Sequence, residues 1–225
     1  MSLANAQTAV DPRLPPELEQ IIFQVQHLRY RVLLLLRDPD APHGVRGYPH
    51  NDDSELSRLR SLPHSTWRDS VRHLCIDLYS PEPVDFLLFT CSSVENLWVV
   101  SQNLPLISAL PLKRLHTLLD HLFFPRPIDF TNVLFSRLTH LEIFDRHLRA
   151  EPSIWSSLKS LWHLTHLAFH DADLLFIFAD LLCICSSWRV LVLISRTAQP
   201  PPYVPRELAE EPRFVWMVRT QDIED

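Results

Sequence analysis

Two stretches of this sequence nearly repeat one another: Leu138-Thr-His-Leu-Glu-Ile-Phe144 and Leu164-Thr-His-Leu-Ala-Phe-His170. In both, apolar residues occupy the first, fourth and sixth positions, so that the last two lie on one face of an extended strand. The same pattern recurs from residue 71 onward, as Val71/Leu74/Ile76, Val94/Leu97/Val99, Leu138/Leu141/Ile143, Leu164/Leu167/Phe169 and Trp188/Leu191/Leu193. Weaker copies are Leu112/Leu115/Thr117 and Pro212/Val215/Met217. The chain therefore carries an internal repeat.

The spacing of the copies indicates the kind of repeat. Their central apolar positions lie 18 to 26 residues apart, and leucine-rich repeats have periods of about 20 to 29 residues. Helix-like segments separate the copies, at Pro83–Thr90, Ile154–Trp162 and Asp173–Ser187. One strand–helix unit cannot bury its own apolar face, so neighbouring units must stack. The sequence predicts an α/β leucine-rich-repeat-like solenoid of parallel strands and convex-side helices, preceded by a short N-terminal helix.

The repeats are degenerate, and an alternative remains open. The Asn or Cys that usually follows each strand is replaced by Tyr79, Arg146, Ala172 and Arg196. An asparagine ladder therefore cannot hold the turns. The alternative is an ordinary α/β domain in which the repeated strings are coincidental.

A stacked sheet would carry the remaining strand side chains on its concave surface. A curved surface of polar and aromatic groups is typical of protein binding. The residues expected there are Arg72, His73, Asn96, Trp98, His116, Glu142, His166 and His170.

Composition excludes several functions. The chain has 225 residues, of which 46% are hydrophobic, and a net charge of −6 without a basic block, so no nucleic-acid partner is expected. The apolar stretches Val32–Leu36 and Leu174–Cys185 are shorter than the about 20 residues of a membrane span, so no membrane partner is expected either. The first residues lack the pattern of a secretory signal. We expect a cytoplasmic or nuclear protein whose four cysteines are reduced.

Glycine usage argues against large enzyme classes. The only two glycines are Gly44 and Gly47, both in one loop. Phosphate-binding loops and the nucleophile turn of hydrolases need glycine at several positions that this chain cannot supply. The sequence predicts no enzyme, no catalytic residue and no cofactor.

Candidate metal and catalytic groups have structural explanations. His163 and His166 lie three positions apart, an odd interval, so on a strand they would point to opposite faces. Cys183 and Cys185 lie two apart in a helical pattern and do not face each other. No metal site is expected. Ser156-x-x-Lys159 matches an acyl-enzyme motif whose companion motifs are absent. A hydrolase that uses His170 and Asp171 is a further alternative of little weight.

The N-terminal segment carries a more specific string. Pro15 and Pro16 favour a helix start, and Leu18, Ile21 and Ile22 share one helical face. Leu14-Pro-Pro-Glu-Leu18 followed by Ile21-Ile22-Phe23 resembles the opening of the F-box. It is most similar to F-box-like proteins abundant in mushroom-forming fungi, in which degenerate leucine-rich repeats follow.

This resemblance implies a substrate receptor or adaptor of a cullin–RING (SCF-type) ubiquitin ligase. Two protein partners follow, the ligase adaptor subunit and a target protein, with a monomer outside the complex. The residues implied to face the adaptor are Leu14, Pro15, Leu18, Ile21, Ile22 and Phe23. A full F-box has about three helices, whereas here Gln24–Val32 leads directly into a strand at Leu33–Leu36. We therefore hypothesise that the F-box is truncated and that adaptor binding is weak or lost. The alternative is a standalone leucine-rich-repeat-like scaffold without a ligase connection.

The expected domain organisation follows from these segments. Residues 1–12 are a tail, 13–36 the partial F-box-like helix with the first strand, and 37–66 a loop or linker. Residues 67–220 form the repeat domain and 221–225 a second tail.

Overall fold

The computed structural model describes residues 32–36, 50–51, 56–57, 60–61, 63, 68–77, 81–145, 155–170, 175–195, 204 and 206–218. Within them, nine strands form one open sheet in which every pairing is parallel. The sheet order is β2-β1-β3-β4-β5-β6-β7-β8-β9. The strands are β1 (Val32–Leu36), β2 (His50–Asn51), β3 (His73–Asp77), β4 (Asn96–Val99), β5 (Arg114–Thr117), β6 (His140–Ile143), β7 (His166–Phe169), β8 (Val190–Ser195) and β9 (Phe214–Val218). The predicted α/β class with parallel strands is confirmed.

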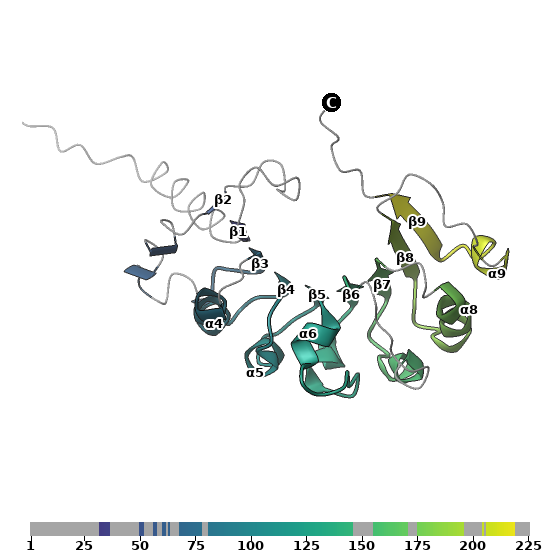
Figure 1. Cartoon of the computed structure of the whole chain (residues 1–225), viewed down its shortest axis with the longest axis horizontal. Coiled ribbons are helices and arrows are strands. Elements are labelled where there is room, and N and C mark those ends of the chain that lie inside the picture. The colour runs from purple at the N-terminus through teal and green to yellow at the C-terminus, as the bar shows by residue number, and fades with distance from the viewer. Residues whose placement is uncertain are drawn as a thin grey trace, which may run out of the picture.

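Helical segments connect successive strands from β3 onward. They are α4 (Pro81–Thr90), α5 (Leu104–Ser108), α6 (Leu119–Phe123), η1 (Val133–Arg137), η2 (Ser157–Ser160), α8 (Leu175–Ile184) and α9 (Arg206–Ala209). Figure 1 shows these strands along the inner side of an arc, with the helical segments on its outer side. The sheet therefore has one face covered by helices and an opposite face, which we call the inner face.

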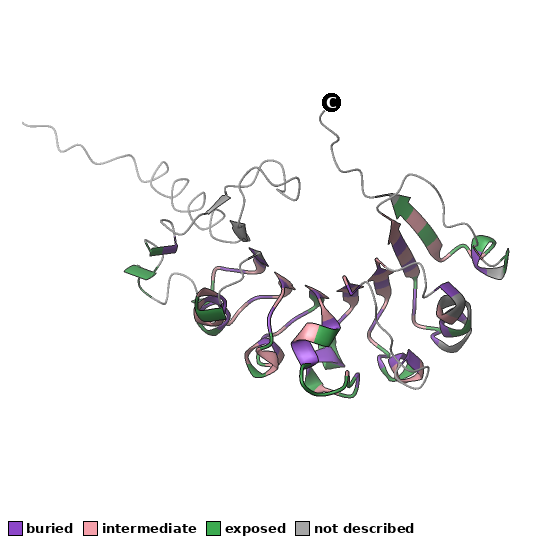
Figure 2. Ribbon diagram, viewed as in Figure 1, coloured by how far each residue is buried: buried purple, intermediate pink, exposed green. Residues whose placement is uncertain are grey.

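The repeated leucines lie at one level of the sheet. Leu74 is the register partner of Leu97, and the same alignment continues strand by strand through Leu115, Leu141, Leu167 and Leu191. Each of these leucines is at most 2% exposed. Buried residues alternate with half-buried ones along the strands, and the core lies between the sheet and the helical layer (Figure 2). The β1 residue Leu33 pairs with Leu74 and extends this level toward the N-terminus.

The last copy of the pattern is shifted by one residue from its prediction. The sequence pattern placed Val215 at the central position, but Leu191 pairs with Phe214. A shift of one residue moves every side chain to the opposite face of a strand. Phe214 and Trp216 therefore pack against the core, whereas Val215 and Met217 are 38% and 52% exposed.

The helical layer differs from its prediction mainly in length and type. The helix expected from Pro83 begins at Pro81, and the helix expected at Asp173–Ser187 spans Leu175–Ile184. Within the segment expected to be helical from Ile154 to Trp162, the structure has the 3-10 helix Ser157–Ser160.

A buried carboxylate holds the start of α6. The carboxylate of Asp145 accepts hydrogen bonds from the amides of Leu119 and Asp120, at 2.5 and 3.2 Å. Desolvation by burial raises the pKa of Asp145 to about 6, in spite of these hydrogen bonds. Asp145, shortly after β6, thereby fixes the start of α6, the helix that follows β5.

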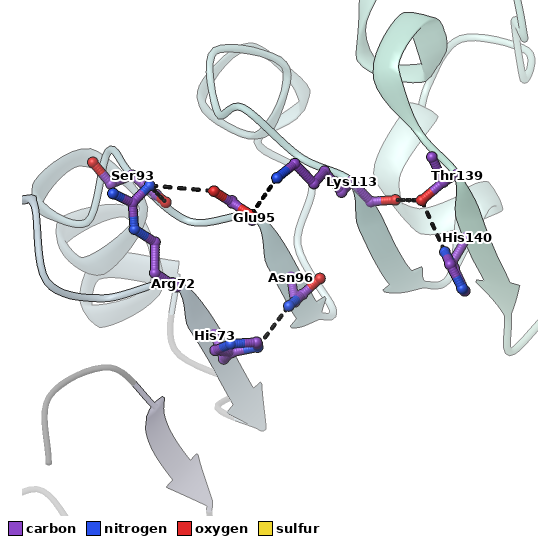
Figure 3. Close-up of polar contacts among 8 residues, drawn as sticks. All are labelled: Arg72, His73, Ser93, Glu95, Asn96, Lys113, Thr139 and His140. Carbon is purple, nitrogen blue, oxygen red and sulfur yellow. Dashed lines mark hydrogen bonds and ion pairs between the residues drawn. The ribbon is translucent and has the colours of Figure 1, made fainter. Parts of the chain in front are cut away.

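A ladder of backbone hydrogen bonds joins the repeats where their strands begin. The carbonyl of Lys113 accepts from the amides of both Thr139 and His140, at 2.8 and 3.1 Å. The same arrangement occurs from Arg72 to Glu95/Asn96, from Glu95 to Lys113/Arg114, from Thr139 to Thr165/His166 and from Thr165 to Arg189/Val190. Side chains reinforce the ladder, as Figure 3 shows for Glu95, which lies between Arg72 and Lys113. These contacts join neighbouring strand–helix units of the sheet.

Several predictions concern residues outside the described ranges. They include the N-terminal tail, the six residues expected to face an adaptor, most of the 37–66 linker and the C-terminal tail. Among the residues that the structure does describe, no helix has both the length and the apolar character needed to cross a membrane.

The shared leucine level can be tested by truncating one of its members. We expect Leu141→Ala to lower the free energy of unfolding by about 2–5 kcal/mol, because Leu141 is 2% exposed and its loss leaves a cavity between sheet and helices. Val133→Ala is the control, since Val133 is 67% exposed and should change stability by less than about 0.5 kcal/mol. Urea unfolding measures both, and equal effects would contradict the assignment.

Candidate binding surface on the inner face

The inner face carries two levels of side chains, most of them half-buried and two of them, Arg114 and Val215, exposed. The first level, nearest the strand starts, consists of the register partners His73, Asn96, Arg114, His140, His166 and Val190. The second level consists of Cys75, Trp98, His116, Glu142, Ala168, Val192 and Val215. Polar and aromatic groups dominate from β3 to β6, and aliphatic groups dominate on β8 and β9.

The structure brings together most of the residues expected on this face. Trp98, His116 and Glu142 are neighbours on adjacent strands of the second level. His166 lies on the first level, and His170 directly follows β7 and reaches back to Glu142.

Arg72 lies apart from this group. It precedes β3, and its guanidinium donates to the Ser93 carbonyl and to Glu95 at the strand-start edge (Figure 3). Adjacent residues of an extended chain point to opposite sides. Arg72 and His73 therefore diverge, and the His73 ring accepts a hydrogen bond from Asn96 at 2.6 Å.

Glu142 is the centre of the second level. His116 Nδ1 donates to its Oε2 at 2.6 Å, and His170 Nε2 donates to its Oε1 at 2.7 Å. Burial acts to raise the pKa of Glu142, but the two histidine hydrogen bonds and the positive charge of the imidazoles outweigh it, so the pKa falls to about 2. The carboxylate is ionised at neutral pH, and both of its oxygens are engaged.

An aromatic side chain that the sequence analysis did not select frames this network. Phe144 directly follows β6, and its ring centroid lies 5.0 Å from that of His170 and 5.7 Å from that of Trp98. The signal was available in the aligned stretches, since Phe144 occupies the position that His170 has in the next copy. Phe144 limits the side-chain freedom of Trp98 and His170.

His140 and His166 form a stacked pair on the first level. Their ring centroids are 4.1 Å apart and their planes differ by 3°. Burial, followed by the positive charges of His166, Arg114 and His116, lowers the pKa of His140 to about 4. Burial, followed by Arg114 and Arg189, also lowers the pKa of His166. Both rings are therefore neutral near pH 7.

The surface is hollowed beside these histidines. A shallow hollow of about 240 Å³ is bordered on the polar side by His116, His140, Glu142 and His166, and on the apolar side by Ala168, Val192, Ile194 and Met217. A smaller hollow of about 150 Å³ lies between β3, β4 and β5, against Trp98. Shallow hollows of mixed chemistry fit side chains of a partner better than they fit an enclosed small molecule.

The other candidate groups do not assemble into a site. His163 packs its ring against Trp162, Cys185 is buried, and desolvation raises the pKa of its thiol to about 11. Asp171 and Asp173 lie outside the described residues. Among the residues that are described, no group of three or more His, Cys, Asp or Glu has the geometry of a metal site.

Comparison of the chain with family models, with curated proteins and with solved structures gives no match. The fold and the site define the class: an α/β protein with one open parallel sheet, helices on one face and a polar, aromatic and aliphatic surface on the other.

The network at Glu142 predicts a pH dependence of stability. The folded pKa lies below the ordinary value of 4.5, so the network stabilises the fold above about pH 4.5 and this contribution is lost as pH falls toward about 2. The stability difference between the wild type and Glu142→Gln should therefore shrink on acidification. Urea unfolding at several pH values between about 6 and 3 measures this difference.

Glu210→Gln provides the control. Glu210 pairs with Arg206 on the exposed surface, where ion pairs contribute little, so its replacement should change stability little at every pH. A difference between wild type and Glu142→Gln that stays constant with pH would contradict the role of Glu142.

Proposed function

We propose that this chain is a leucine-rich-repeat-like solenoid that binds a protein partner on its inner face. The observation that carries the proposal is the composition of that face, on which Trp98, Phe144 and the histidines of successive strands surround shallow hollows. Aromatic side chains held by packing are the residues that contribute most of the energy in protein interfaces. The spacing and register of the leucines support the repeat assignment.

Binding rather than catalysis accounts for the polar groups. Glu142 shares its two oxygens between His116 and His170, so its negative charge is used to hold the two rings in place. A general base must take up a proton from the substrate, and a carboxylate whose pKa is held at about 2 is a weak base. The network serves to fix the shape of the surface.

The ligase connection comes from the N-terminal string. Leu14-Pro-Pro-Glu-Leu18 and Ile21-Ile22-Phe23 resemble the adaptor-binding start of an F-box. On this basis the chain is a substrate receptor or adaptor of a cullin–RING ubiquitin ligase, acting in the cytoplasm or nucleus. Its N-terminal segment would bind the adaptor subunit and its inner face would present the target.

A standalone scaffold is the second candidate. The observation in its favour is the shortness of the F-box-like segment, since only residues 24–31 separate Phe23 from the start of β1 at Val32, whereas a full F-box has about three helices. In that case the N-terminal helix would serve as the cap of the solenoid, which stacked repeats need at their ends.

Adaptor binding separates the two candidates. For a ligase receptor, the purified full chain should bind the adaptor subunit, and Leu18→Asp should abolish binding by placing a charge among apolar contacts. Val133→Asp, at an exposed position of the repeat region, should leave binding unchanged. Calorimetry or biolayer interferometry measures both. Absence of binding by the wild-type chain would favour the scaffold.

Target binding should depend on Trp98. Loss of a packed interface tryptophan typically costs about tenfold or more in affinity, so Trp98→Ala should remove most cross-linked partners. Trp162→Ala is the matched control, since Trp162 is 71% exposed and lies outside the inner face. Quantitative cross-linking of both variants in cells provides the readout. Equal partner recovery would contradict the proposed surface.

A further inference from the structure

We infer that Arg114, His140 and His166 form a receptor site for a carboxylate side chain of the partner, with an apolar neighbour of that side chain resting in the adjacent hollow. This inference rests on the proposed function, because it specifies the chemistry of the segment bound on the inner face. The three residues are called the basic cluster below.

The geometry of the basic cluster is set by strand register. Arg114 pairs with His140 and His140 pairs with His166, so the three side chains lie in line on β5, β6 and β7. The two imidazoles are stacked 4.1 Å apart. A row of this kind presents several donors to one ligand group.

The hydrogen bonds of the threonines determine which nitrogens remain available. Thr139 and Thr165 each donate a hydroxyl proton to a backbone carbonyl of the preceding repeat, at 3.0 Å, and each hydroxyl oxygen lies 2.8 Å from Nδ1 of the following histidine. The hydroxyl proton is used, so we assign the imidazole proton to Nδ1, which donates to the oxygen. Figure 3 shows this chain of contacts from Lys113 through Thr139 to His140. Nε2 of both rings remains free to take up a proton and bind.

The positive charge of the basic cluster is not neutralised within the described part of the chain. Arg114 is exposed and forms no ion pair or side-chain hydrogen bond with a described residue. The other charged groups of this region are His116 on β5, Glu142 on β6 and His170 after β7, and these three satisfy one another. At the strand-start edge, Glu95 is likewise engaged by Arg72 and Lys113.

An acidic ligand would change the protonation of the pair. Burial first, and then the positive neighbours, keep His140 and His166 neutral in the free protein. A carboxylate seated against Arg114 reverses that effect and favours the imidazolium, whose Nε2–H can then donate to it. Binding therefore takes up protons. Affinity should rise as pH falls from about 6.5 until the ligand carboxylate is itself protonated near pH 4.

The adjacent hollow indicates what accompanies the carboxylate. Beside the histidines, Ala168, Val192, Ile194 and Met217 form an aliphatic wall, and Met217 is 52% exposed. Burial of apolar surface there favours an aliphatic side chain on the ligand. The occupant is thus a segment of a partner protein with Asp or Glu next to an aliphatic residue.

The test uses the dipeptide N-acetyl-Glu-Leu-amide as probe, with N-acetyl-Gln-Leu-amide as its neutral match, and follows the histidine ring signals of the full chain by NMR. We expect the acidic dipeptide to perturb His140 and His166, to raise their pKa values and to bind more tightly at pH 6 than at about pH 8. In Arg114→Gln the affinity should fall about tenfold, as for one lost charge-assisted hydrogen bond. Arg114→Lys should retain part of the affinity for the acidic dipeptide. Arg137→Gln, at an exposed position of η1, should bind the dipeptide with the wild-type affinity.

The possible outcomes separate this inference from the proposed function. Equal binding of the neutral dipeptide, unchanged histidine pKa values or full affinity in Arg114→Gln would overturn the carboxylate site. If the site fails in this way while partner recovery still depends on Trp98, the binding module stands and only its ligand chemistry is wrong. If the dipeptide binds as expected while recovery is independent of Trp98, the carboxylate site stands and the proposed inner-face function fails.

Discussion

The hydrogen bonds at the strand starts are the constraint on which the rest of this structure depends. Each of the carbonyls of Arg72, Glu95, Lys113, Thr139 and Thr165 accepts two amides from the next repeat. This bifurcated contact fixes the register between neighbours, although the connections between them differ in length and helix type. With register fixed, the leucines meet at one level and the polar side chains meet in rows on the inner face. A one-residue slip would exchange the two faces, so core and surface are specified together.

The sequence predicted this arrangement wherever only one register buried the apolar residues. At Leu138–Ile143, polar residues alternate with apolar ones, and the central Leu141 lies where the pattern placed it. At Phe214–Val218 every residue is apolar, so hydrophobicity cannot choose between Phe214 and Val215. The backbone pairing with β8 places Phe214, and not Val215, beside Leu191. The sequence also could not predict whether a connection forms an α-helix or a 3-10 helix. A short connection can satisfy its backbone hydrogen-bonding groups equally well in either form.

The surface was predicted less completely than the fold. Trp98, His116 and Glu142 were found because strand alternation alone selects them. Phe144 and the partnership of His170 with Glu142 lie beyond the strand ends, where direction depends on packing. The stacking of His140 on His166 could not be predicted, because it depends on the distance between neighbouring strands, which the sequence of one strand does not give. Arg72 was predicted on this face together with its neighbour His73, but adjacent strand residues point to opposite sides, and Arg72 is paired with Glu95 at the strand-start edge.

The two levels of the inner face differ in how their charges are balanced. On the second level, the negative charge of Glu142 is balanced by its contacts with His116 and His170. On the first level, two stacked imidazoles stand beside Arg114, and no described carboxylate pairs with them. Neutral histidines make this arrangement tolerable, since protonating them beside Arg114 would cost free energy. The second level is thus held rigid by its own hydrogen bonds, whereas the first level keeps a positive charge that no described carboxylate neutralises.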